Sequence, residues 1–171
     1  KTALQYHGKP QVEYCFELLR THMEQVFVSC RHDQRDAKHI KDFPQIHDAA
    51  PHGGPGHGIL RAFEHAPQAT WLVLSSDMPH VDHDTISTLI KHRDSTKHAT
   101  AFLNADKQWL EPLCTIYEPS ASRIISDALH IHGMSCPRKI LNRMMMTCDV
   151  KAKTQVWIKN VNQPDQIEHL T

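Results

Sequence analysis

Acid and amide side chains follow three short apolar runs in this sequence, at positions where they could bind a ligand. They are Asp48, Asp77, Asn160 and Asn162. If the apolar runs are parallel strands, these side chains stand beyond the carboxyl ends of the strands, where open α/β sheets bind ligands. On spacing alone a second interpretation stays equally open, in which Asp77 caps a helix or makes a turn before Pro79 and the asparagines form an Asx turn.

A glycine-rich run lies between the first two acids and holds four of the six glycines of the chain. It covers residues 52–58, includes Gly54 and Gly58, and leads into an amphipathic stretch at residues 59–65. A turn of this kind presents backbone N–H groups to an anion, although glycine also serves in plain tight loops. A carboxylate beside bound phosphate suits Mg²⁺, so the pattern indicates a magnesium and phosphate site.

The elements that must position these side chains alternate between strand and helix. The clearest strand is Trp71-Leu72-Val73-Leu74, a continuous apolar run that favours a central parallel strand covered on both faces. Further strands are predicted at residues 26–28, 43–46, 99–103, 113–117 and 156–158. Helices are predicted at residues 11–23, 59–65, 86–92 and 120–130, with a short one at the C-terminus. Asp84 or Thr85 is expected to cap the third helix. This alternation predicts an α/β fold, with a mostly parallel sheet between layers of helices.

Bulk composition narrows the class of protein. A length of 171 residues with 40% hydrophobic residues fits one globular domain. Lys plus Arg and Asp plus Glu are 19 each, so the zero net charge argues against nucleic acid and against anionic membrane as partners. No signal peptide or membrane span is visible, and five widely spaced cysteines without a C-x-x-C pair indicate reduced thiols and a cytoplasmic protein.

Fifteen histidines suggest a metal site of a different kind. His47, His52 and His57 recur every five residues, which matches neither a helix face nor a strand face. Two closer pairs are His80-x-x-His83 and His130-x-His132. Neither matches a structural zinc pattern completed by cysteines. Surface histidines are therefore the preferred interpretation, and a histidine-bound metal ranks last among the hypotheses.

Several segments, in the correct order, resemble the molybdenum cofactor guanylyltransferase family of nucleoside triphosphate transferases. The family pattern has an Asp before a G-P-x-x-G-I-L turn, a strand ending in C-D-x-P, an E/Q-P-x-x-x-x-Y strand and a closing N-V-N-x-P-E-D. The matching residues are Asp48, Gly54-Pro55-Gly56-His57-Gly58-Ile59-Leu60, Ser76-Asp77-Met78-Pro79, Glu111-Pro112-Leu113-Cys114-Thr115-Ile116-Tyr117 and Asn160-Val161-Asn162-Gln163-Pro164-Asp165. Residues 1–10 are similar to the stretch after the signature L-A-G-G-x-S-x-R-M-G-x-D-K, with Lys1 as its final lysine.

The resemblance implies a three-layer α/β/α sandwich of the nucleotide-diphospho-sugar transferase type, with a Rossmann-like central sheet. Residues 1–171 would then be a single nucleotidyltransferase domain without its extreme N-terminal strand and nucleotide loop, because the signature stands upstream of Lys1. The implied reaction transfers GMP from GTP to molybdopterin, or to the molybdenum cofactor, and releases pyrophosphate with Mg²⁺ as cofactor. Other proteins of molybdenum cofactor biosynthesis, or molybdoenzymes, would be the protein partners.

The same resemblance implies a role for each candidate residue. Asp77 would hold Mg²⁺, and Lys1 would neutralise charge on the reacting phosphates. Asp48 would contact the nucleotide or help to order the metal site, and the turn at Gly54 and Gly58 would contact the nucleotide. Hydrogen bonds from Asn160 and Asn162 would reach the pterin or the nucleotide.

Two departures from the family pattern keep alternatives open. Gly56-His57 replaces larger apolar and small residues in the turn, and Ser29-Cys30-Arg31 stands where many relatives have an asparagine that touches the nucleotide. Either change could alter the choice of base, so a cytidylyl or sugar-phosphate nucleotidyltransferase is the nearest alternative. A non-catalytic binding module of molybdenum cofactor biosynthesis is the alternative from a different class.

Overall fold

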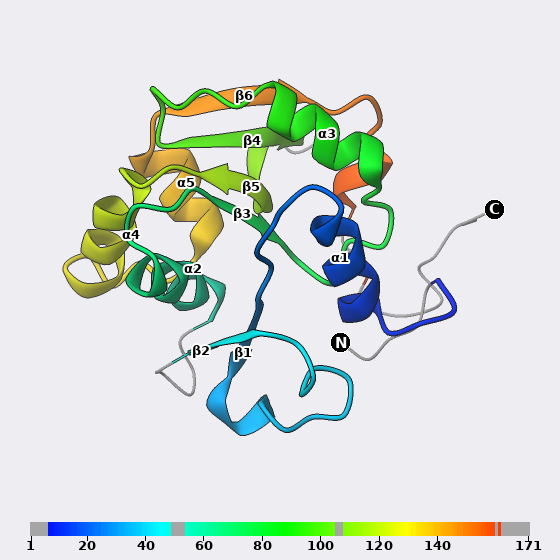
Figure 1. The fold of residues 1–171 in the computed structure, drawn as a ribbon. Helices are drawn as coiled ribbons and strands as arrows, with labels where there is room; N and C mark the ends of the chain where they lie inside the picture. The colour runs from blue at the N-terminus through cyan, green and yellow to red at the C-terminus, as the bar shows by residue number, and fades with distance from the viewer. Residues whose placement is uncertain (1–6, 49–53, 105–107, 160, 162–171) are drawn as a thin grey trace.

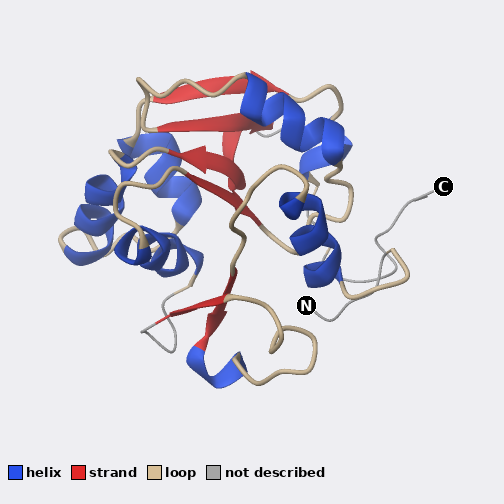
Figure 2. Ribbon diagram, viewed as in Figure 1, coloured by secondary structure: helices blue, strands red, loops and turns tan. Residues whose placement is uncertain are grey.

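A computed structural model describes residues 7–48, 54–104, 108–159 and 161 of the chain (Figures 1 and 2). Its helices are α1 (Gln11–Arg20), α2 (Pro55–His65), α3 (His83–Lys91), α4 (Ala121–His130) and α5 (Pro137–Met144). Its strands are β1 (Val28–Arg31), β2 (Gln45–Asp48), β3 (Trp71–Leu74), β4 (Ala99–Asn104), β5 (Trp109–Tyr117) and β6 (Thr147–Lys151). Two 3₁₀ helices complete the list, η1 (His32–Gln34) and η2 (Gln155–Ile158). In the described residues, no helix is long and apolar enough to cross a bilayer.

The strands form two groups. One is a sheet in the order β3–β5–β4–β6, and the other is the parallel pair β1–β2. In the larger sheet β5 is antiparallel to both β3 and β4, while β4 and β6 are parallel. Hence β3, β4 and β6 all run in one direction, and the predicted mostly parallel sheet is confirmed with one reversed strand.

Helices cover both faces of the larger sheet (Figure 1). One buried cluster packs α2, α4 and α5 against a face that includes Ala99, Ala101 and Tyr117. The other packs α1, α3 and η2 against a face that includes Phe102 and Ile116. Successive residues of a strand point to opposite faces, so each strand supplies both clusters. This arrangement confirms the three-layer α/β/α architecture.

Strand β3 is where the structure departs from the expected pairing. The apolar run predicts a central strand between parallel neighbours, but in the described residues β3 is the first strand of its sheet and pairs only with antiparallel β5. Its side chains are half-buried. A continuous apolar run indicates that both faces of a strand are covered. It does not show which strands pair with it.

Other predicted elements need smaller corrections. Helix α1 ends three residues early, at Arg20, and the strand predicted at residues 26–28 begins only at Val28. The strand predicted at residues 156–158 is the 3₁₀ helix η2, an ambiguity expected for three apolar residues. Strand β6 and helix α5 were not predicted as such, since β6 buries only Val150.

The N-cap of α3 also differs from the prediction. Asp82, rather than Asp84 or Thr85, occupies this position. Its Oδ1 accepts hydrogen bonds from the backbone N–H of Thr85 at 2.8 Å and from the Thr85 hydroxyl at 2.7 Å. Thr85 therefore takes part in the cap as the third residue of the helix, not as the cap itself.

Candidate active site

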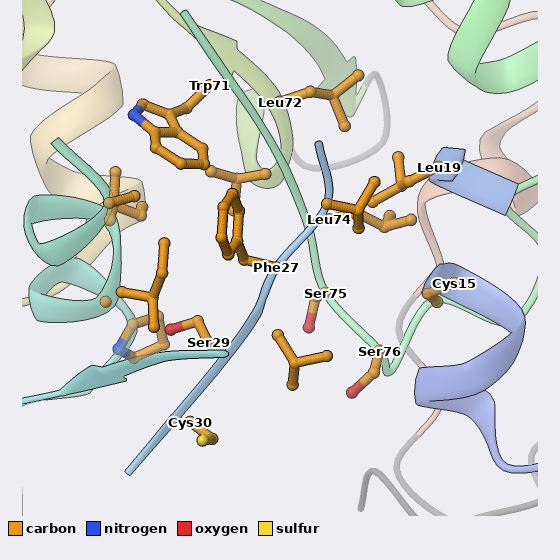
Figure 3. A pocket seen from close by; sticks show the side chains of 18 of the residues that line it. Cys15, Leu19, Phe27, Ser29, Cys30, Trp71, Leu72, Leu74, Ser75 and Ser76 are labelled. Atoms are coloured by element: carbon orange, nitrogen blue, oxygen red, sulfur yellow. The ribbon is translucent and has the colours of Figure 1, made fainter. Parts of the chain in front are cut away.

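A cavity of about 500 Å³ lies between β1 and β3, with α1 and α2 as its other walls (Figure 3). The end near Trp71 and Leu72 is apolar, and the opposite end carries Ser29, Ser75 and Ser76. Since β3 runs from Trp71 toward the serines, the polar end is its carboxyl end. Asp48, Gly54 and Gly58 line the same cavity. The structure thus places these predicted residues around one cavity.

Asp48 is the last residue of β2 and contacts the first turns of α2. A Cβ atom at Gly58 would lie 2.9 Å from Ser29 Oγ and 3.4 Å from Asp48 Oδ1. Only a glycine leaves room for a hydroxyl and a carboxylate to approach this helix so closely. Ser29 and Asp48 sit on adjacent parallel strands, which brings their side chains together.

Two opposing effects act on the pKa of the Asp48 carboxylate. Burial raises the pKa of Asp48, and the nearby charges of His57, Arg61 and Arg31 pull it back down. Its Oδ1 atom is buried and lacks a hydrogen-bond partner within the described part of the chain. An unpaired buried oxygen of this kind is unfavourable, so a hydroxyl or other donor of a ligand would be stabilised here.

The glycine-rich turn opens α2 as predicted. Gly54 is the N-cap residue, and its φ of +69° is a conformation that favours glycine. Pro55 follows at the first helical position, where a missing N–H is not a loss. Gly54 and Pro55 line the cavity, so the N-terminus of α2, the end of a helix that can bind an anion, lies at its wall.

Asp77 directly follows Ser76, which lines the cavity, but Asp77 itself is not among the lining residues. Its backbone carbonyl accepts a hydrogen bond from the N–H of Val161 at 2.7 Å. Its Oδ1 atom is buried, with no hydrogen-bond partner among the described residues. Because Asp82 caps α3, the helix-cap interpretation of Asp77 is wrong, although the residue does lie in a turn. A buried carboxylate oxygen without a donor fits a cation ligand.

Cys15 of α1 lies close enough to Asp77 for the two groups to interact electrostatically. Burial raises the pKa of the Cys15 thiol to about 12, and the negative charge of Asp77 adds to the effect. Cys15 also lines the cavity. The thiol is therefore protonated at neutral pH and is a neutral, apolar neighbour of the acid rather than a nucleophile.

The remaining predicted site residues are not placed. Lys1, Asn160 and Asn162 lie outside the described residues, although Val161 between the two asparagines contacts Asp77. Among described side chains, no group of three or more His, Cys, Asp or Glu converges on one point. Mg²⁺ usually completes its coordination with substrate phosphates and water.

Sequence reasoning missed Ser29 as part of this site. The residue was noted only as a departure from the family pattern, and its contact with Gly58 links positions 29 residues apart. No local sequence pattern predicts a contact between residues this far apart in the chain. Ser75 and Ser76 had a signal, since small polar residues directly follow the apolar run of β3.

A mostly parallel α/β/α sandwich with a glycine-rich turn opening a helix, and an acid beyond a strand end, defines the class of nucleotide-transferring α/β domains. The family model of the MobA-like NTP transferase domain matches residues 1–148, and the chain belongs to this family. The resemblance drawn from the sequence motifs is thereby confirmed.

Two relatives illustrate the similarity. The chain is 32% identical over 166 residues to a molybdenum cofactor biosynthesis bifunctional protein of Synechocystis, covering 96% of this chain and 47% of that protein. It is 25% identical over 165 residues to a molybdenum cofactor guanylyltransferase of Pseudomonas aeruginosa PAO1, covering 96% of this chain and 82% of that protein. The chain thus spans about half the length of the Synechocystis relative.

Solved structures share the fold. Molybdopterin-guanine dinucleotide biosynthesis protein A from Archaeoglobus fulgidus superposes with a TM-score of 0.76 at 22% identity, covering 96% of this chain and 85% of that one. A 4-diphosphocytidyl-2C-methyl-D-erythritol synthase from Anaerococcus prevotii gives a TM-score of 0.67 at 8% identity, covering 96% and 88%. The nucleotide-diphospho-sugar transferase type of fold is confirmed.

Proposed function

We propose that this domain is a Mg²⁺-dependent nucleotidyltransferase that transfers GMP from GTP to molybdopterin or the molybdenum cofactor. A phosphate oxygen of the acceptor attacks the α-phosphorus of GTP, the bond to the β-phosphate oxygen breaks, and pyrophosphate leaves. The proposal draws support from the family and from the names of the relatives in Synechocystis and Pseudomonas. The substrates are small molecules, and a cytoplasmic location agrees with five free thiols.

The observation that carries the proposal is the buried, unpaired Oδ1 atom of Asp77 beyond the carboxyl end of β3. Nucleotidyl transfer needs the charge of the phosphates neutralised and their positions fixed. Asp77 would hold Mg²⁺, which would bridge and neutralise phosphate oxygens when bound. A carboxylate oxygen that is buried and has no donor among the described residues is suited to that role.

The opposite wall of the cavity would orient the nucleotide. The N-terminus of α2, from Gly54 to Gly58, would direct backbone N–H groups at phosphate or sugar oxygens. Asp48 and Ser29 would accept and donate hydrogen bonds to a sugar or base. Lys1 would neutralise phosphate charge, and Asn160 and Asn162 would bind the pterin or the nucleotide through their amides.

The first test is calorimetric titration of GTP, CTP and ATP with Mg²⁺ into the chain preceded by the family signature segment. We expect selective GTP binding that depends on Mg²⁺ and weakens at least tenfold in Asp77→Ala. Thermal unfolding of Asp77→Ala should stay within a few degrees of the unchanged chain, since Asp77 is half-buried and its Oδ1 makes no hydrogen bond to a described residue.

Asp84→Ala is the matched control, because Asp84 is an exposed acid at the start of α3, away from the cavity. It should leave both GTP affinity and turnover unchanged. Full activity in Asp77→Ala would refute the assigned metal ligand. Selectivity for CTP would assign the domain to a cytidylyl transferase activity, and failure to bind any nucleotide would favour a non-catalytic module.

A further inference from the structure

Two histidine rings from distant parts of the chain meet beside α1 and α3. His22 follows α1, and His83 is the first residue of α3, 61 positions further along the chain. The Nε2 atom of His22 lies 3.3 Å from the Nδ1 atom of His83, and the ring centroids are 5.4 Å apart. Neither ring lines the cavity, so the pair is separate from the candidate active site.

The distance between the two nitrogens suits a shared metal ion better than a hydrogen bond. Hydrogen bonds donated by nitrogen are usually about 2.7–3.2 Å long. In a tetrahedral site with Zn–N bonds of about 2.0–2.1 Å, two ligand nitrogens are about 3.3–3.4 Å apart. Ligands at right angles, as in square-planar or octahedral sites, would be only about 2.9 Å apart at the same bond length. The observed 3.3 Å therefore matches tetrahedral zinc.

The backbone that carries each ring is held by hydrogen bonds. The backbone N–H of His22 donates to the carbonyl of Leu19 at 3.0 Å, which continues the last turn of α1. His83 stands between Asp82 and Thr85, the two residues that form the capping box of α3. Both ring-bearing positions are therefore parts of ordered helix ends, and a ligand pair placed on such elements is positioned more precisely than one placed on loops.

Further contacts keep α1 and the start of α3 together. The Tyr14 hydroxyl of α1 donates to the carbonyl of Val81, two residues before α3, at 3.1 Å. The Thr21 hydroxyl lies 3.3 Å from the Nδ1 atom of His83. Both helices also pack against the same face of the larger sheet (Figure 1). An ion bound by the two rings would join elements whose relative position is already set, so binding would cost little conformational freedom.

We propose that His22 and His83 form a zinc site, in which His22 Nε2 and His83 Nδ1 are two ligands of a tetrahedral ion. Water supplies the other ligands, because no third His, Cys, Asp or Glu converges on the pair within the described part of the chain. Imidazole nitrogen suits Zn²⁺, whereas Mg²⁺ prefers oxygen ligands and would not compete. The bound ion would tie the end of α1 to the start of α3.

The test is titration of chain 1–171 with Zn²⁺ at pH 7.5, followed by NMR of the histidine rings, which separates this pair from the other histidines. We expect the ring resonances of His22 and His83 to shift together along one saturable curve. Mg²⁺ at the same concentrations should shift neither. Saturating Zn²⁺ should also raise the midpoint of thermal unfolding by a few degrees, because the ion binds only the folded arrangement of the two rings.

His22→Gln and His83→Asn distinguish metal binding from a hydrogen bond between the rings, because an amide can still donate and accept hydrogen bonds. Each variant should weaken zinc binding at the remaining ring at least tenfold. The double variant should lose no more than either single variant, since a chelate needs both rings. His92→Gln is the matched control, because the exposed His92 ring contacts the Thr88 carbonyl of its own helix at 2.8 Å. It should leave the zinc affinity of the pair unchanged.

Ring resonances of the pair that respond to Zn²⁺ no more strongly than those of His92 would overturn the proposal. Single-variant losses that simply add in the double variant would also overturn it, since each ring would then bind an ion separately. The titration of the unchanged chain decides the question even if a variant proves unstable. None of these measurements involves nucleotide, so a failed zinc site and a failed transferase assignment would be distinguishable.

Discussion

At the scale of single residues, the site depends on close approaches that leave no spare volume. Gly58 allows Ser29 and Asp48 to meet α2, and Gly54 supplies a positive φ at the start of that helix. Both carboxylates of the site, Asp48 and Asp77, have a buried oxygen without a partner in the described residues. Such groups reduce stability, and under the proposed function a ligand would pair with them and offset that cost.

Gly58→Ala tests this packing. The new Cβ would lie 2.9 Å from Ser29 Oγ, so one of the two groups must shift, and we expect a loss of about 1–3 kcal/mol in the free energy of unfolding. In a Ser29→Ala background the hydroxyl is absent and the same substitution should be clearly less harmful. Urea unfolding of the two single variants and the double variant measures the coupling. Strictly additive effects would show that Ser29 is not the group that excludes a side chain at position 58.

At the scale of elements, an ion pair between a buried Glu118 and a partly exposed Arg93 fixes the sheet at the end of β3 away from Asp77. Arg93, which follows α3, reaches Glu118 after β5 through two hydrogen bonds of 2.6 and 2.9 Å. Thr70, just before β3, donates to the same carboxylate at 2.9 Å. Glu118 is 3% exposed. One carboxylate thus holds together the ends of three elements, including the start of the strand that leads to Asp77.

Glu118→Gln should lower the free energy of unfolding by about 2–3 kcal/mol at pH 7, because it removes charged hydrogen bonds from a buried group. The hydrogen bonds from Arg93 hold the pKa of Glu118 below its ordinary value of 4.5. The stabilisation is therefore complete well above pH 4.5 and is lost as pH falls from there toward the lower folded-state pKa. Urea unfolding of both proteins between pH 3 and pH 7 measures the difference.

Glu64→Gln is the control for this prediction. Glu64 pairs with Arg61 on the surface of α2, and its side chain is 46% exposed, so the effect should stay below about 1 kcal/mol. A difference between Glu118→Gln and the unchanged chain that does not shrink as pH falls from 7 to 3 would contradict an electrostatic origin.

At the scale of the whole molecule, the reactivity of the cysteines measures how well the packed layers cover their thiols. Cys15, Cys30 and Cys114 are buried, whereas Cys136 and Cys148 are partly exposed, and all five are free. Burial raises the pKa of each buried thiol, that of Cys15 to about 12. These thiols therefore present little thiolate at pH 8, in addition to being covered.

An aromatic disulfide reagent at pH 8 should modify two thiols quickly and the other three only slowly, with all five reacting in denaturant. Cys136→Ser should lower the fast amplitude by one. The slow phase should accelerate as urea is added, because the reagent then waits for local or global opening. A fast amplitude of three or more would show that the cavity admits reagent to Cys15 or Cys30.

The sequence by itself determined the class of fold and most of the candidate site. Apolar periodicity predicted α1, α2, α4 and β3 near their observed positions. The reason is that the spacing of apolar residues within a single segment shows which face of that helix or strand is buried. Asp48, Asp77 and the glycine turn were found because strand ends and helix starts carry short-range signals. The motifs then gave the family, which the family model confirms.

Only the tertiary structure decided how the strands pair and which side chains meet. A strand pattern of period two is the same for either direction, so the antiparallel placement of β5 between β3 and β4 was not predictable. The contact of Ser29 with Gly58 and the open edges of β1 and β3 likewise depend on segments far apart in the chain. Strand pairing is a long-range property, and local patterns determine burial without determining the neighbour that provides it.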